Sequence, residues 1–201
     1  MTESGNGTIR AYNAIHELYD AETRDFWQRF PQETVKKFAS LLPGKEIVDL
    51  GSGPGRDAVI LKEMGLFVTC VDGSERMIEM TKKLGFKSIL ADLSALELQK
   101  DSFSGAWAYS SLIHLTFDEA RKLLEKVYIS LKKDGLLFLG LIEGDGNETT
   151  SVAGSDYKRY FEYYSRGKLE ALITGIPFKI IYESTFQPGN HVYLHYILKK
   201  S

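Results

Sequence analysis

The sequence has 201 residues, of which 43% are hydrophobic and 26% charged, and its formal net charge is −2. This composition suits one globular domain, and the charge gives no electrostatic reason to expect nucleic acid or an anionic membrane as a partner. The single cysteine, Cys70, excludes an intrachain disulfide and a thiolate metal cluster, and its apolar neighbours predict a buried thiol.

Membrane spans and targeting signals are not expected. No apolar run approaches the roughly 20 residues that cross a bilayer. The polar start MTESGNGTIR lacks the basic-then-apolar order of a signal peptide. The sequence therefore predicts a cytoplasmic protein, and its scattered histidines predict no metal site.

Two helices are predicted before residue 45. Their segments are AYNAIHELYDAETRDFWQRF (residues 11–30) and PQETVKKFASLL (31–42), the second with Pro31 at its first position. Tyr12 and Tyr19 are seven residues apart and therefore share one face of the first helix.

Strands and helices then alternate. Five short apolar runs are typical of buried parallel strands: KEIVDL, LFVTCVD, FKSILAD, FSGAWAYSS and LLFLGLI. Segments of helical spacing separate them, including PGRDAVILKEMG, SERMIEMTKKLG and FDEARKLLEKVYISLKKDG. This order indicates right-handed βαβ units that build a parallel sheet covered on both faces.

The last part of the chain follows a different pattern. Residues 143–156, EGDGNETTSVAGSD, are linker-like in composition. FKIIYESTF and HVYLHYILKK alternate apolar and polar residues, and the short QPGN connection can join only antiparallel strands. We therefore expect an α/β fold: a Rossmann-like, mostly parallel, seven-stranded sheet with helices on both faces and an antiparallel C-terminal hairpin.

The stretch IVDLGSGPGRDA, residues 47–58, indicates a ligand-binding turn after the first strand. Its glycines allow unusual φ values and a close approach of the backbone to a ligand. Asp72 ends the second strand about twenty residues on, where an acid accepts the hydroxyls of a ribose.

Two residues disfavour a dinucleotide at this turn. The third glycine of G-x-G-x-x-G would fall at position 56, which is Arg56, and Asp49 would stand close to a pyrophosphate. A ligand with a ribose, no phosphate and an ammonium group to meet Asp49 fits better. S-adenosylmethionine has these parts, and its carboxylate can use the free N–H groups of a helix start.

Several motifs, in order, resemble the class I S-adenosylmethionine-dependent methyltransferases, in their small-molecule branch. These are VDLGSGPG, VTCVDGSERMIEMTKK, ILADLSAL, FSGAWAYSSLIHL and EKVYISLKKDGLLFL. The resemblance implies one domain with an N-terminal helical cap (1–42), a cofactor-binding core (43–142), an acceptor-side insert and helix (143–175) and a closing hairpin (176–201). It implies methyl transfer to a small molecule and these cofactor-binding residues: Tyr19, Asp49, Gly51, Ser52, Gly53, Gly55, Asp72, Gly73, Met77, Asp92, Leu93, Tyr109 and Ser110.

Each role has an alternative. Asp72 is a ribose ligand or a strand-ending acid, Asp92 meets adenine or caps a turn, and Met77 lines the pocket or the core. Arg56 holds a carboxylate or is a surface charge, and His114 is a general base or, as we favour from sequence, a packing residue.

Two segments are ambiguous in the same way. Residues 8–30 are either a lid over the cofactor or an ordinary packing helix, and the aromatic segment 155–172 forms an acceptor pocket or a packed cluster. The alternative functions are an NAD(P)-linked Rossmann oxidoreductase and a non-catalytic S-adenosylmethionine-binding protein.

Overall fold

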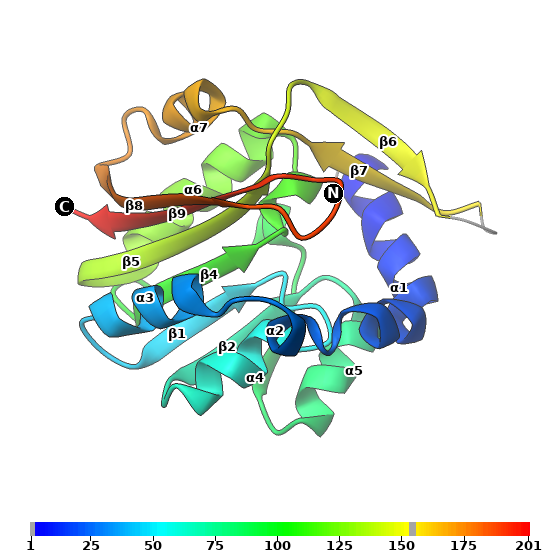
Figure 1. Cartoon of the computed structure of the whole chain (residues 1–201), viewed down its shortest axis with the longest axis horizontal. Helices are drawn as coiled ribbons and strands as arrows, with labels where there is room; N and C mark the ends of the chain where they lie inside the picture. The colour runs from blue at the N-terminus through cyan, green and yellow to red at the C-terminus, as the bar shows by residue number, and fades with distance from the viewer. Residues whose placement is uncertain (1–2, 153–155) are drawn as a thin grey trace.

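A seven-stranded sheet in the order β3-β2-β1-β4-β5-β9-β8 runs through the structure, a computed structural model that describes residues 3–152 and 156–201 (Figure 1). Strands β3 to β5 are mutually parallel, and β9 and β8 are antiparallel additions at one edge. The strands are β1 (Glu46–Leu50), β2 (Phe67–Asp72), β3 (Lys87–Leu90), β4 (Phe103–Tyr109), β5 (Leu131–Ile142), β8 (Phe178–Phe186) and β9 (Tyr193–Lys200). The mostly parallel sheet and its C-terminal hairpin are confirmed.

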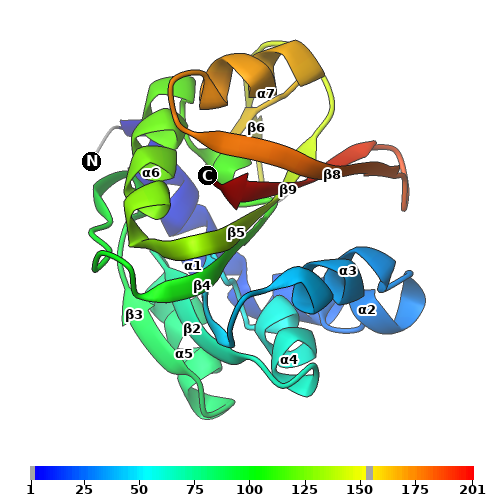
Figure 2. The same cartoon turned by 90° about the vertical axis from the view of Figure 1, so that its left-hand side faces the viewer.

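Helices cover both faces of the sheet, as predicted. One buried cluster joins the sheet to α6 and α7, and a second joins its other face to α2, α3 and α4. Figure 2 shows α2, α3 and α4 on one side of the sheet and α6 on the other. The helices are α1 (Glu3–Thr23), α2 (Phe26–Arg29), α3 (Glu33–Leu41), α4 (Arg56–Glu63), α5 (Glu75–Lys83), α6 (Phe117–Ser130) and α7 (Arg166–Ile173).

The central strands are buried because their side chains are apolar on both faces. Ile47, Val48 and Leu50 of β1 have no exposed surface, and Cys70 of β2 is equally buried. Parallel strands covered by helices on both sides require such continuous apolar runs. Within the described residues, no helix is both long and apolar enough to cross a membrane.

The N-terminal prediction was wrong in its boundaries. One long helix was expected over residues 11–30, but the chain forms α1 and the short α2, with a break between Thr23 and Phe26. Pro31 was expected at the first position of the next helix, but that helix, α3, begins at Glu33. The break turns Trp27 inward, where its indole donates to the buried Asp57 at 2.8 Å.

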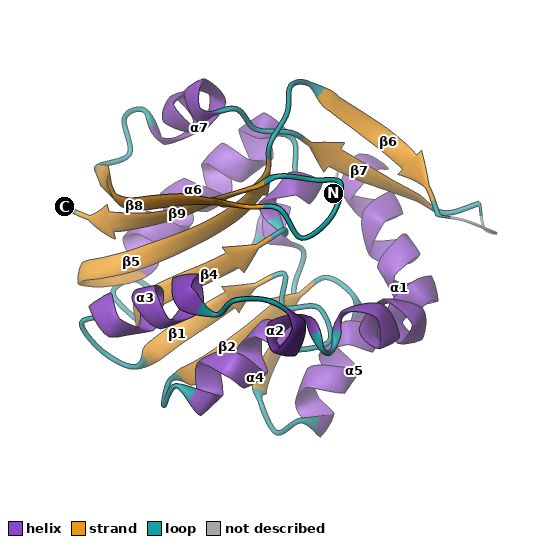
Figure 3. Cartoon of the chain, viewed as in Figure 1, coloured by secondary structure: helices purple, strands orange, loops and turns teal. Residues whose placement is uncertain are grey.

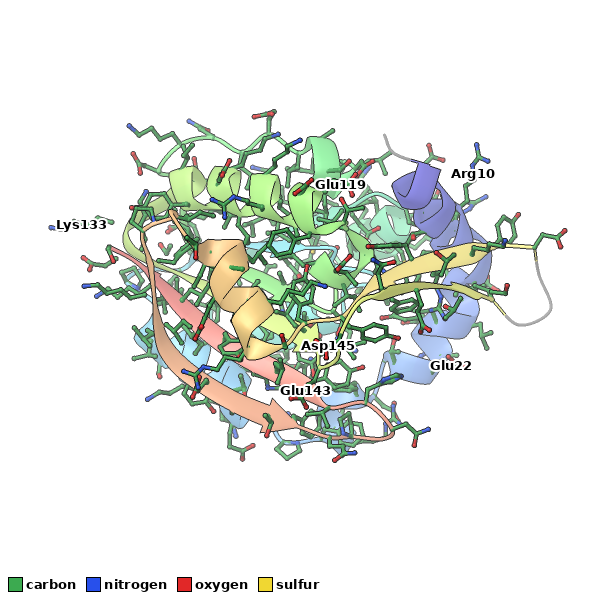
Figure 4. The ribbon with its side chains drawn as sticks, turned by 90° about the horizontal axis from the view of Figure 1, so that it is seen from above. Arg10, Glu22, Glu119, Lys133, Glu143 and Asp145 are labelled. Atoms are coloured by element: carbon green, nitrogen blue, oxygen red, sulfur yellow. The ribbon has the colours of Figure 1, made fainter. Side chains whose placement is uncertain are left out.

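The linker-like segment 143–156 contains a strand, which corrects its interpretation as a flexible connection. Strand β6 (Asn147–Ser151) pairs antiparallel with β7 (Lys158–Glu162) in a separate two-stranded sheet. Figure 3 shows this hairpin projecting from the main sheet toward α1. Seen from above in Figure 4, Glu143 and Asp145 lie near its base, and Arg10 projects from the outer side of α1. Residues 153–155 of the predicted linker lie outside the described residues.

Candidate functional site

A pocket lies at the carboxyl ends of β1, β2 and β4, next to the point where the strand order reverses on either side of β1. This is the usual ligand position in an open parallel sheet. It holds about 700 Å³ of space free of protein atoms, part of it open to solvent. Its lining residues are Thr8, Ile9, Tyr12, Tyr19, Gly51, Gly53, Asp72, Gly73, Met77, Asp92, Leu93, Tyr109, Ser110, Ser111, His114 and Leu115.

The glycine turn forms the floor of this pocket. Gly51 and Gly53 have φ values of +70° and +53°, a backbone conformation that residues other than glycine rarely adopt. A Cβ on Gly51 would collide with the side chain of Ser111, so the turn can pass β4 only with glycine there. The amide of Gly53 donates to Asp72 Oδ2 at 2.9 Å, which ties the turn to the end of β2.

Asp72 is fixed by backbone groups rather than by a cation. Its Oδ2 accepts from Gly53 N, and its Oδ1 accepts from Ser74 N at 2.8 Å. Burial raises the pKa of Asp72, against the opposing effect of these N–H groups. Each carboxylate oxygen retains acceptor capacity beyond these bonds, so the side chain can also receive hydroxyl donors from a ligand.

Asp92 caps a turn, one of the two roles that the sequence left open, and it also lines the pocket. Its Oδ1 accepts from the amide and hydroxyl of Ser94, at 2.9 and 2.8 Å, and so caps the short 3-10 helix η1 (Leu93–Ala95). Its Oδ2 is buried and has no hydrogen-bond partner among the described residues. The hydroxyls of Ser110 and Ser111 are likewise buried and have no hydrogen-bond partner among the described residues.

These three buried oxygens bear on which ligand fits the pocket. A buried polar atom without a partner costs free energy, which a ligand's donors or acceptors can offset. Ser110 also has a φ of +56°, a conformation uncommon for serine that occurs preferentially at functional sites. The pocket thus offers two carboxylates, two hydroxyls and a glycine floor, a set that fits a nucleoside with an amino acid end.

Three residues predicted for the site do not line the pocket. Asp49 lies within β1, where burial, followed by the nearby Asp57, raises its pKa. Its Oδ2 and the hydroxyl of Ser52 are buried and find no partner in the part of the chain that the structure describes. Gly55 has a φ of +96° and is the N-cap residue that precedes α4, close to Thr81 of α5. The structure brings the other predicted residues together.

Arg56 is not a solvated surface charge. Its Nε donates to Asp57 Oδ1 at 2.6 Å, and its guanidinium lies 4.6 Å from the centre of the Phe26 ring. Asp57 also accepts from the indoles of Trp27 and Trp107, at 2.8 and 2.9 Å. This buried cluster joins α2 and α4 to the sheet beside the pocket.

Helix α1 roofs the pocket. One face of it supplies Thr8, Ile9, Tyr12 and Tyr19 to the lining. Figure 1 shows the helix beyond the arrowhead end of β4. Asn13 on the same helix accepts hydrogen bonds from Ser74 Oγ at 2.7 Å and from the amide of Arg76 at 3.2 Å, which anchors α1 on the start of α5.

Part of this roof is not predicted from the sequence. Tyr12 and Tyr19 share one helix face, yet only Tyr19 is predicted for the site. Thr8 lies one helical turn before Tyr12 on that same face, so the 3.6-residue period was the signal that could have found it. Ser111 and Leu115 follow β4 and carried no separate signal.

His114 ends the short 3-10 helix η2 (Leu112–His114) and lines the pocket beside Tyr12. Its Nδ1 lies 2.7 Å from the carbonyl oxygen of Tyr160 on β7, and its Nε2 lies 2.9 Å from the hydroxyl of Tyr12 on α1. Burial, reinforced by the positive charge of Arg159, lowers the pKa of His114 to about 4. The ring is therefore neutral near pH 7.

Residues 48–139 match the family model described as "Methyltransferase domain". A protein of Geobacillus sp. (strain WCH70), named as a methyltransferase, is 30% identical over 132 residues. The match covers 60% of this chain and 51% of that protein, so the chain spans about half the length of this relative.

Solved structures share the fold. A complex titled DhpI-SAH superposes with a TM-score of 0.80 at 16% identity, covering 98% of this chain and 97% of the other. The 1,6-didemethyltoxoflavin-N1-methyltransferase of Burkholderia thailandensis has a TM-score of 0.67 at 21% identity, with 94% and 87% covered. That enzyme's structure contains 1,6-didemethyltoxoflavin and S-adenosylhomocysteine.

Proposed function

We propose that the chain is a class I S-adenosylmethionine-dependent methyltransferase, as the match of residues 48–139 to a methyltransferase domain supports, and that it transfers a methyl group to a small-molecule acceptor. The observation that carries this proposal is the pocket at the switch point, where Asp72 at the end of β2 and Asp92 after the neighbouring β3 line one cavity with the glycine turn that follows β1. The amide of Gly53 binds Asp72 although the two residues are 19 positions apart in the chain.

The pocket residues divide the cofactor's parts among them. Asp72 would accept the two ribose hydroxyls, because backbone amides already hold its carboxylate in place. Asp92 Oδ2, with no partner among the described residues, would accept from the adenine amino group. Leu93 and Met77 offer apolar contacts for the adenine ring, and the glycine turn leaves room for the amino acid end.

When bound, S-adenosylmethionine supplies an electrophilic methyl carbon on a sulfonium. The protein then has to orient the acceptor and exclude water, since alignment contributes most of the acceleration in such a displacement. Helix α1 helps to exclude water from the pocket. Ile9, Tyr12 and Tyr19 cover the pocket with apolar and aromatic surface.

A small acceptor is supported by the way the pocket is enclosed. Its roof is α1, and the β6–β7 hairpin packs beside that roof through the bond from the amide of Tyr160 to Thr8 Oγ1 at 3.1 Å. The 1,6-didemethyltoxoflavin-N1-methyltransferase of B. thailandensis is named for a small-molecule acceptor and shares the fold. We extend that class of acceptor to this chain.

The experiment is a turnover assay that reports the product common to all acceptors. Purified protein is incubated with S-adenosylmethionine and a panel of phenols, alcohols, amines, thiols and carboxylic acids, and S-adenosylhomocysteine is quantified by chromatography. We expect S-adenosylhomocysteine to form in the presence of at least one acceptor class and not in its absence. A protein that binds the cofactor tightly but forms no S-adenosylhomocysteine with any member would support the non-catalytic alternative.

A further inference from the structure

We propose that Tyr12 and His114 act as a pair that takes a proton from the methyl acceptor, so that the acceptor is a neutral hydroxyl or amine compound. This inference rests on the proposed function and names the acceptor chemistry of the same site. Both side chains line the pocket, and they come from elements far apart in the chain, α1 and η2.

The hydrogen bonds of His114 determine which of its nitrogens carries the proton. A carbonyl oxygen can only accept, so the 2.7 Å contact with Tyr160 O requires a proton on Nδ1. In a neutral imidazole Nε2 is then an acceptor, and the hydroxyl of Tyr12 donates to it across 2.9 Å. The basic nitrogen of the pair therefore lies next to the pocket and is reached through a phenol.

The groups around the pair keep both side chains neutral at rest: burial lowers the pKa of His114 to about 4, and burial followed by Tyr19 raises the pKa of Tyr12, an effect that Arg159 opposes only in part. Arg159 of β7 is the cation beside the pair, with its guanidinium 5.6 Å from the centre of the Tyr12 ring. His114 is faced by Tyr12 from α1 and by the backbone of Tyr160 from β7. Burial and Arg159 lower the pKa of His114 to about 4, so Nε2 keeps its lone pair at neutral pH.

The acceptor's X–H bond breaks and its proton moves to Tyr12 Oη, while the proton of Tyr12 moves to His114 Nε2. The X–H electron pair forms the bond to the methyl carbon, and the electrons of the S–C bond stay with the sulfur of the methyl donor. The imidazolium, disfavoured by burial and by Arg159, returns its proton to solvent after the products leave.

A second buried histidine shows what distinguishes this pair. His195 also lies near a tyrosine hydroxyl, with Nε2 3.2 Å from Tyr109 Oη, and burial lowers its pKa to about 4 as well. It does not line the pocket. Only the tyrosine of that contact, Tyr109, lines the pocket, whereas both Tyr12 and His114 do.

The test compares Tyr12→Phe and His114→Asn with two matched controls. Tyr128→Phe removes an exposed phenol that bonds Ser201 O, and His195→Asn removes the buried histidine outside the pocket. Single-turnover rates are measured with a phenol, an alcohol, a primary amine and a thiol, together with S-adenosylmethionine affinity by calorimetry. We expect a ~10²-fold or larger fall in the rate for the phenol, alcohol or amine in both pocket variants, with cofactor affinity within threefold.

A second readout does not depend on turnover. In the unliganded protein, ¹⁵N NMR of His114 should show the neutral Nδ1–H tautomer from pH 8 down to near pH 4, and Tyr12→Phe should change the Nε2 shift. A wild-type protein that methylates only the thiol, variants that lose only cofactor affinity, or an Nε2–H tautomer would each overturn the inference. A wild-type protein that does not bind S-adenosylmethionine would instead contradict the proposed function, and this inference with it.

Discussion

Asp72 is held by two backbone amides before any ligand arrives. Gly53 N and Ser74 N each donate to a different carboxylate oxygen, so the side chain has one orientation. Asp92 is fixed in the same way, through Ser94, on one of its oxygens only. A preoriented acceptor binds a ligand without losing its own rotamer freedom at that moment.

Asp72→Ala is expected to weaken S-adenosylmethionine binding by ~1–3 kcal/mol, because two ribose hydroxyls lose their charged acceptor. Calorimetric titration of the two proteins measures the difference. Asp145→Ala, which removes an exposed carboxylate far along the chain, is the matched control and should keep wild-type affinity. Equal affinity in Asp72→Ala and wild type would rule out Asp72 as the ribose ligand.

Helix α1 packs closely on a glycine. A Cβ on Gly73 would lie 2.7 Å from Ile9 Cδ1, closer than side chains pack, so a side chain at position 73 would force Ile9 of α1 to shift. Ile9 and Gly73 both line the pocket, so the contact between them couples the roof to the end of β2.

Gly73→Ala should therefore displace α1 and weaken cofactor binding, and adding Ile9→Ala should restore much of the affinity. Gly167→Ala is the control, because a Cβ there meets nothing within 4 Å. Calorimetry on the single and double variants gives the coupling between the two sites. Additive losses in the double variant would mean that the contact between Ile9 and Gly73 does not set the position of α1.

If α1 closes over the cofactor, the amides of residues 8–23 should exchange slowly only when S-adenosylmethionine or its product is bound. Hydrogen exchange followed by mass spectrometry measures this. The β1 amides serve as the internal control, since this strand is paired on both sides and should be protected in either state. Equal protection of α1 with and without ligand would indicate a packing helix.

At the scale of the whole molecule, buried histidines make stability depend on pH. Burial lowers the pKa of His114 and His195 to about 4, below the ~6.5 of the unfolded chain. Between these values the unfolded chain binds more protons, so the free energy of unfolding rises with pH there and is lost as the pH falls from 6.5 to 4. The raised pKa values of Asp49 and Asp72 act in the opposite sense.

Replacing one histidine isolates its part of this effect. His195→Gln should lower the slope of unfolding free energy against pH between pH 5 and 6 by up to about 1.4 kcal/mol per pH unit. Urea unfolding at several pH values measures both slopes, with Tyr128→Phe as a control that leaves the titrating groups intact. An unchanged slope would mean that His195 titrates normally in the folded protein.

The sheet could be predicted from the sequence because each parallel strand is an apolar run and the closing hairpin has an unmistakably short turn. The β6–β7 hairpin could not, since Asn147–Ser151 is polar and forms a strand only by pairing with β7. Asp72 and the glycine turn could be predicted from their spacing and Asp92 from the family resemblance, whereas Asp49 and Gly55, predicted with them, do not line the pocket. The bond from His114 to Tyr160 O was not, because it joins residues 46 positions apart through a backbone atom.

The central claim is that the pocket holds S-adenosylmethionine, and calorimetric titration of the wild-type protein with S-adenosylmethionine and with NAD tests it most directly. We expect saturable one-to-one binding of S-adenosylmethionine and no binding of NAD, since Arg56 takes the place of the third glycine of the dinucleotide motif G-x-G-x-x-G. Saturable binding of NAD, with no heat from S-adenosylmethionine, would contradict it.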